Sequence, residues 1–410
     1  MDNILPVHGT QQTYIKITRN MDFSALDDGA YKNIRVINAV IDMDNHMLRS
    51  YKTGSSTNND TTFSLVDGNS TVKNIVAGGT YGKAFIGQNY GTVSNVTAYS
   101  AELFYESKYA DHDKYTLADC GTGTFIYKNA GKLDTGIYYS TPAYYSSFLE
   151  YTTGLFTNFD IMYVDRTVFV TYNGKQYPSI AYDNTDRGSS GCGYNAIVTH
   201  AAGIMTNINV DADADTIYVS DFMFMYDTVP TREYRDNMFV LIRNFVMQPM
   251  YVKILHTYSS IFSAYAGSNS ALVLFDCKWP DMTFEPVQGY SYAAGTTRAA
   301  QPYSPDRISY TYMPNGLQGT VYGYDCDIQY TCSIASNNVA FNNYESAAYV
   351  NCNVIVNYKR AEDSWATGDL YTIDEFAELR KNNEYASLYS SIRSNTYISY
   401  IDYSNFSFNV

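Results

Sequence analysis

The chain has 410 residues, 45% of them hydrophobic, and a net charge of −14, so it can bury a core and is strongly acidic. No basic stripe is present to neutralise phosphates, which argues against a nucleic-acid partner and against anionic membranes. No window reaches about 18 consecutive apolar residues, so we expect no transmembrane helix. The most unusual number is 43 Tyr beside 2 Trp, and because Tyr favours strands this composition predicts a β-rich protein.

Residues 1–30 are polar and irregular, with one expected strand at residues 13–17. The first residues lack a basic region followed by an apolar run, so they predict no secretory signal. We expect this segment to be an arm, or a cap that covers the first layer of the fold.

Residues 31–140 repeat themselves. The stretch 71–77 (TVKNIVA) recurs 21 residues later as 92–98 (TVSNVTA), and the stretch 84–100 recurs 40 residues later at 124–140. Such periods predict stacked coils, in which short apolar strands alternate with turns at Asn or Gly and neighbouring coils bury each other's faces. The residues expected to point inward are Phe85, Ile86, Val93, Val96, Phe125, Ile126 and Leu133.

Within this repeat, residues 85–96 (FIGQNYGTVSNV) resemble the GLUG-type repeat of bacterial surface adhesins. The second copy departs from that repeat at Tyr127, where a Gly is expected, and at Thr135, where an Asn is expected. The resemblance covers two coils; it implies a β-solenoid and, as one function, adhesion. The rest of the chain is similar in texture to pectate-lyase-like β-helices and to phage tail and head-fibre proteins.

Residues 141–235 lose the repeat. Two strand-like runs, 167–172 and 176–182, flank Asn173-Gly174, a strong signal for a tight hairpin turn. This section is either an inserted antiparallel β section or a set of long coils with decorations, and we expect the insertion.

Coils resume over residues 236–360. Cys277, Cys326 and Cys352 share one local context, an apolar or aromatic residue followed by Asp or Asn and then Cys. Because a buried thiol packs as a small hydrophobic group, we expect these three side chains to point into the core of successive coils. All six Cys of the chain are expected to be reduced.

Residues 361–410 change character. Thr372 and Glu375 form a capping box, so we expect a helix over 373–393, followed by a strand-like tail. Helix and tail would cap the solenoid or bind a neighbouring subunit.

One constellation could be chemical. Asp211, Asp213 and Asp215 alternate, so a strand would turn all three carboxylates to one side. A cation such as Ca²⁺ would relieve their repulsion, a glycosidase would use such a pair, and a solvated loop would leave them in water. They are the candidate metal ligands, Ca²⁺ is the one cofactor considered, and no catalytic residue is assigned.

Together these features predict an all-β fold: a right-handed parallel β-helix with an inserted β section and a short C-terminal helix. The expected function is that of a phage-type virion structural protein, a tail or head fibre or decoration protein, made in the host cytoplasm. It would form a homo-oligomer, with three copies as the expected number, and contact other virion proteins and host glycans. The alternatives are a tailspike depolymerase that cleaves polysaccharide with paired carboxylates, and a GLUG-like bacterial adhesin.

Overall fold

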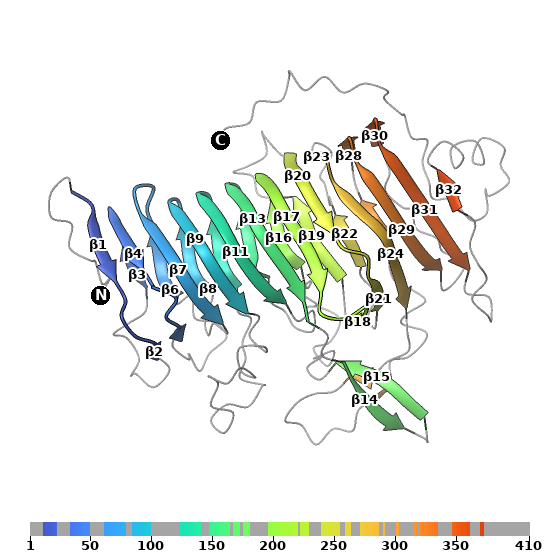
Figure 1. Cartoon of the computed structure of the whole chain (residues 1–410), viewed down its shortest axis with the longest axis horizontal. Helices are drawn as coiled ribbons and strands as arrows, with labels where there is room; N and C mark the ends of the chain where they lie inside the picture. The colour runs from blue at the N-terminus through green and yellow to red at the C-terminus, as the bar shows by residue number, and fades with distance from the viewer. Residues whose placement is uncertain are drawn as a thin grey trace.

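The computed structural model describes the following residues: 11–22, 33–49, 61–78, 84–99, 124–140, 147–164, 167–172, 175–180, 196–219, 222–228, 239–254, 259–263, 271–286, 290–291, 301–302, 315–318, 320–334, 347–360 and 370–372. All regular structure in these residues is β-strand, and most strands belong to two long parallel sheets that run along one axis (Figure 1). The predicted parallel β-helix is therefore confirmed. The helix expected over 373–393 lies outside the described residues, and nothing helical within them could span a membrane.

The smaller sheet, sheet A, has nine strands in the described part of the chain, each paired in parallel with the next. They are β3 (Ile34–Val36), β6 (Thr61–Val66), β8 (Ala84–Asn89), β10 (Thr124–Asn129), β12 (Leu149–Thr152), β16 (Ala196–Ala201), β19 (Phe222–Thr228), β22 (Ser259–Ser263) and β27 (Asn315–Gln318).

The larger sheet, sheet B, has 17 described strands. It begins at β1 (Thr13–Lys16), which pairs with β4 (Ala39–Asp42), and ends at β32 (Leu370–Thr372), the one antiparallel member. Between them lie β7 (Thr71–Gly78), β9 (Thr92–Tyr99), β11 (Lys132–Ser140), β13 (Leu155–Tyr163), β17 (Ile204–Ala212), β18 (Thr216–Val219), β20 (Phe239–Met247), β21 (Tyr251–Ile254), β23 (Ala271–Phe275), β24 (Lys278–Pro286), β28 (Thr320–Tyr324), β29 (Asp327–Ile334), β30 (Ala347–Val350) and β31 (Asn353–Arg360).

Two smaller sheets lie beside the solenoid. The predicted hairpin is present as β14 (Thr167–Tyr172) and β15 (Lys175–Ile180), which are antiparallel. It joins β25 (Tyr290–Ser291) and β26 (Gln301–Pro302) in a four-stranded sheet that projects from the solenoid (Figure 1). The other small sheet pairs β2 (Met21–Asp22) with β5 (Leu48–Arg49).

The inserted β section is shorter than the expected span of 141–235. Strands β12 and β13, and then β16 and β17, continue sheets A and B in register with the coils before them. Only the hairpin departs from the stack among the described residues of this span. No repeat is recognisable in the sequence of these coils, because their inward positions stay apolar while the individual residues differ from coil to coil.

Six described strands of sheet B, namely β7, β9, β11, β13, β17 and β20, each contain one residue with a positive backbone φ, and in three later coils such a residue lies between two strands of this sheet. In β9 this residue is Asn95 (φ 53°), and the burial pattern shows what the bend does: Val93 and Val96 are buried, whereas the two residues between them face outward. Asn adopts this conformation more readily than most residues. The equivalent positions are Asn74, Thr135, Asn158, Asn207, Asn244, Asp276, Asp325 and Asn351, with φ between 50° and 62°.

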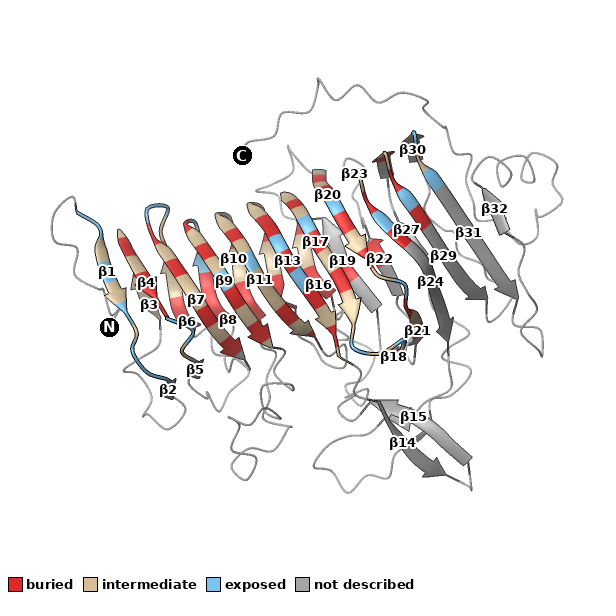
Figure 2. Ribbon diagram, in the orientation of Figure 1, coloured by how far each residue is buried: buried red, intermediate tan, exposed pale blue. Residues whose placement is uncertain are grey.

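The core is built from stacked side chains. Phe85, Phe125 and Phe148 follow one another in consecutive coils with ring centroids 5.6 and 5.1 Å apart. Buried apolar residues line the inside of the coils wherever burial is described (Figure 2). All seven residues predicted to point inward are at most 6% exposed. The inward register predicted from the repeat is therefore confirmed.

The corner from sheet A to sheet B carries a buried polar ladder. Asn89 Nδ2 donates to Asn129 Oδ1 at 2.8 Å, and Asn129 Nδ2 donates to Thr152 Oγ1 at 3.1 Å. A glycine follows two residues later in each coil, and a Cβ on Gly131 would overlap the carbonyl oxygen of Gly91. The coils therefore stack closely enough at this corner to require glycine.

This contact predicts a position-specific cost for an added methyl group. Gly131→Ala should lower the free energy of unfolding by about 1–3 kcal/mol, because the backbone of the neighbouring coil must move. The matched control is Gly68→Ala, whose Cβ would meet its nearest atom at an ordinary 3.8 Å, and whose effect should stay within about 0.5 kcal/mol. Urea denaturation measures both; equal effects would contradict the close stacking.

The N-terminal end of sheet B is fastened by one carboxylate. Asp42 accepts hydrogen bonds from the Tyr14 hydroxyl at 2.5 Å and from Asn74 Nδ2 at 2.7 Å, and Lys73 Nζ lies 3.4 Å from it. The Tyr14 hydrogen bond, with help from Asn74 and Lys73, holds the pKa of Asp42 well below its usual range. Asp42 thus connects β1, β4 and β7.

The depressed pKa sets the sign of a pH effect. The stabilisation from ionised Asp42 is complete above the ordinary Asp pKa and is lost as the pH falls toward its folded value. The difference in unfolding free energy between the wild type and Asp42→Asn should therefore be larger at pH 6 than at pH 3. Denaturant titrations at both pH values measure it, and a pH-independent difference would rule this role out.

Candidate functional site

The outer face of sheet A carries the most chemically varied cluster in the described residues. In β10 and β16 the burial pattern runs buried, buried, buried, partly exposed, partly exposed, buried, so each strand turns two adjacent residues outward. We call the outward residues of three neighbouring strands the outer strip. Its members are Tyr127 and Lys128 in β10, Glu150 and Tyr151 in β12, and Thr199 and His200 in β16.

The register of sheet A aligns part of this strip in one column. Lys128 pairs with Tyr151, Tyr151 pairs with His200, and His200 pairs with Asp227 of β19. The Tyr151 and His200 rings are stacked with centroids 4.8 Å apart, while Tyr127 meets Tyr151 edge-on at 5.3 Å. A cation, two phenols and an imidazole therefore lie on consecutive strands.

Glu150 is held by its neighbours. Its Oε2 accepts hydrogen bonds from Ser147 Oγ at 2.7 Å and from Thr199 Oγ1 at 3.3 Å. Both of these bonds fall on one oxygen, so Oε1 can accept a further donor. The carboxylate is thus fixed between β12 and β16.

The surroundings shift two pKa values in the strip. Burial raises the pKa of Tyr151, and the nearby Tyr127 and Glu150 add to the effect. Burial lowers the pKa of His200, although the charge of Glu150 opposes this. At neutral pH the strip therefore offers a neutral imidazole and a protonated phenol, which both donate and accept hydrogen bonds.

The three aspartates predicted as metal ligands lie elsewhere, at the end of β17 and directly after it. Ala212 and Ala214 pack against the core, so Asp211, Asp213 and Asp215 point away from it, as alternation predicts. Asp211 Oδ1 accepts a hydrogen bond from the Ala212 N–H at 2.8 Å, and the strand gives way to a bend at 213–215. No group of three His, Cys, Asp or Glu able to hold a metal occurs in the described residues, so the Ca²⁺ site stays a prediction.

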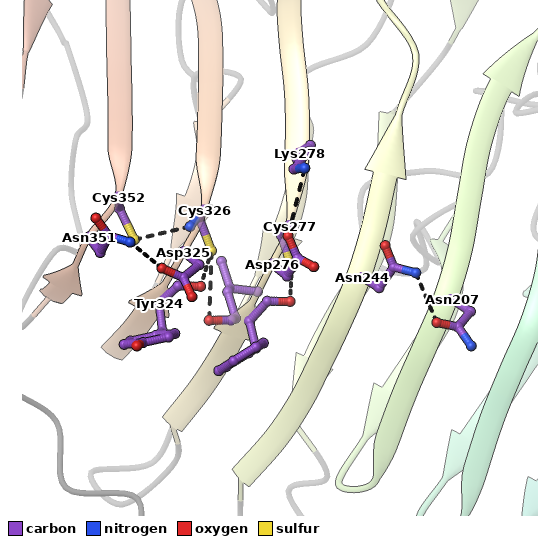
Figure 3. A network of polar contacts seen from close by, with 12 residues as sticks. Asn207, Asn244, Asp276, Cys277, Lys278, Tyr324, Asp325, Cys326, Asn351 and Cys352 are labelled. Carbon is purple, nitrogen blue, oxygen red and sulfur yellow. Dashed lines mark hydrogen bonds and ion pairs between the residues drawn. The ribbon is translucent and has the colours of Figure 1, made fainter.

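The three cysteines occupy consecutive coils, as expected. Cys277 and Cys326 are 0% and 2% exposed, Cys352 packs against the same core, and all three are free thiols (Figure 3). The Cys326 N–H donates to Cys352 Sγ at 3.3 Å, and each thiol donates to a backbone carbonyl. The contact with Cys277 raises the pKa of Cys326 to about 12, so this thiol stays protonated at neutral pH. These thiols are core residues.

The prediction from sequence missed the outer strip. Tyr127 stood out only as a departure from the repeat, and Glu150 and His200 fell in the span where no repeat was recognised. A usable signal was present in the shared pattern of residues 125–129 (FIYKN), 148–152 (FLEYT) and 197–201 (IVTHA). Each has two apolar residues, two polar or aromatic ones and a small or amide residue.

The comparisons with known proteins found no relative. No protein-family model matches the chain, and no curated protein or solved structure matches it. The resemblance to the GLUG-type repeat and to phage fibres therefore stays an interpretation of the sequence.

His200 gives the strip a testable pH dependence. A histidine whose folded pKa is lowered stabilises the fold while neutral, and that contribution is lost as the pH falls below its ordinary value. The wild type should therefore lose more unfolding free energy than His200→Gln between pH 7.5 and pH 5. Parallel denaturation curves measure this; identical losses in the two proteins would show that burial does not penalise the charged imidazole.

Proposed function

We propose that this chain is a structural protein of a phage-type particle, a tail or head fibre or decoration protein, that contacts glycans on the host surface. The observation that carries the proposal is the outer strip, which displays aromatic and hydrogen-bonding groups on a rigid stack of coils. Tyr supplies large contact area at low entropic cost, and its hydroxyl bonds to polar ligands. Such a surface suits neutral, hydroxyl-rich partners.

The shape of the stack supports a fibre or decoration role. The parallel ladders and stacked side chains continue from β4 to β31, so the solenoid is a stiff rod whose connections can vary without disturbing its core. Within the described residues β1 pairs on one side only, with β4, and Tyr14 on it is 57% exposed. An edge strand of this kind suits contact with another copy or with another particle protein.

A second candidate is a depolymerase that cleaves polysaccharide, and the register of sheet A favours it. Asp227 lies in β19, two strands beyond the strand that carries Glu150. At about 4.8 Å per strand the two Cα atoms are about 10 Å apart. Residues at this Cα spacing can bring their carboxyl groups to the separation of roughly 6.5–9.5 Å that inverting glycosidases use. Glu150 and Asp227 are therefore a second set of acidic residues to test, beside Asp211, Asp213 and Asp215.

Two measurements on the full chain test these functions. Light scattering should give a homo-oligomeric mass, with a trimer as the proposed number, and a glycan array should retain the protein. A monomer that binds no glycan would overturn the proposal. Release of reducing ends from a bound polysaccharide, abolished by Glu150→Gln and by Asp227→Asn, would favour the depolymerase instead.

A further inference from the structure

We infer that the outer strip binds an extended β-1,4-linked polysaccharide that lies parallel to the solenoid axis and crosses β10, β12 and β16. The inference rests on the proposed glycan contact and specifies its place and its class of ligand. It follows from the spacing, the chemistry and the rigidity of the strip.

The spacing of the strip matches that of an extended sugar chain. Parallel strands lie about 4.8 Å apart, and the ring centroids of Tyr127, Tyr151 and His200 follow this repeat at 5.3 and 4.8 Å. Successive hexoses of an extended β-1,4 chain repeat at a similar distance, so consecutive sugars can meet consecutive strands in register. A coiled α-1,4 glucan turns away from a straight row and loses this match.

The exposed chemistry of the strip matches sugar hydroxyls. The faces of the stacked Tyr151 and His200 rings are turned toward each other, with 20° between their planes, so a ligand over the strip meets the edges of these rings. Lys128, which pairs with Tyr151 in the register, adds a donor, and Glu150 Oε1, on the residue before Tyr151, adds an acceptor. A hydroxyl both donates and accepts, so each sugar can satisfy groups of both kinds.

The strip is also ordered before a ligand arrives. Ile126 and Asn129, which flank its β10 members, are 0% exposed, and Leu149 and Thr152 are equally buried in β12. Glu150 is fixed by Ser147 and Thr199. A preformed site loses less conformational entropy on binding, and this favours a weakly interacting ligand such as a neutral sugar chain.

Calorimetry on the full chain with defined pentasaccharides tests the inference. Cellopentaose or chitopentaose should bind, and maltopentaose should bind at least about 10-fold more weakly. Tyr151→Ala and Glu150→Gln should each raise the Kd at least about 10-fold, which is 1.4 kcal/mol. The matched control is Tyr139→Ala, which removes a ring stacked on Tyr99 at 5.0 Å in sheet B and should leave the Kd unchanged. Tyr151→Phe, which keeps the ring and removes the hydroxyl, serves if Tyr151→Ala does not fold.

The outcomes separate this inference from the proposed function. If the chain binds glycans on the array but neither β-1,4 pentasaccharide, or if Tyr139→Ala weakens binding as much as Tyr151→Ala, the assignment to the outer strip is overturned and the glycan contact stands. If nothing on the array is retained, the glycan contact itself fails and the assignment fails with it.

Discussion

The close stacking of successive coils at the corner between the two sheets is the constraint on which the rest of the structure depends. Gly91, Gly131, Gly154 and Gly203 lie one above the other there, and a side chain at any of the four would overlap the backbone of the coil before. The amide ladder from Asn89 through Asn129 to Thr152 satisfies the buried polar groups beside them. With the coils fixed at this distance, every equivalent side chain is placed one strand spacing from the next.

A second constraint acts along sheet B, where the chain bends through a positive φ within β7, β9, β11, β13, β17 and β20 and between the two sheet B strands of each later coil. Asn dominates these positions, and its amide also links coils, since Asn207 Nδ2 donates to Asn158 Oδ1 at 2.8 Å. In the same way Asn244 Nδ2 donates to Asn207 Oδ1 at 2.9 Å (Figure 3). Asp replaces Asn at Asp276 and Asp325. A carboxylate has no amide to donate, but it can accept, and Asp325 Oδ1 accepts a hydrogen bond from Asn351 Nδ2 of the next coil (Figure 3).

These two constraints explain how much of the fold was predictable. The short coils around Ile86 and Ile126 repeat nearly residue for residue, so their inward register could be read from the sequence, as could the hairpin at Asn173-Gly174. The coils of β12 and β16 share with the earlier coils only the polarity and approximate size of the residue at each position, so no repeat was recognised there. The outer strip was hidden for the same reason, since outward residues are free to differ between coils. Alternation correctly predicted the outward direction of Asp211, Asp213 and Asp215, but not the bend that ends their strand.

The division between inner and outer positions also indicates where function can lie. Inward side chains must fit the fixed spacing between coils. Even the stacked thiols of Cys277, Cys326 and Cys352 serve only to pack the core. Long connections, such as the one that carries β14 and β15, leave the coils on either side in register. The two outward residues of a sheet A strand can differ in type from coil to coil, while the rigid stack keeps their positions fixed. A site on a sheet face can therefore acquire groups such as Glu150 and His200 one coil at a time while their spacing stays fixed, which suits recognition of a ligand that itself repeats.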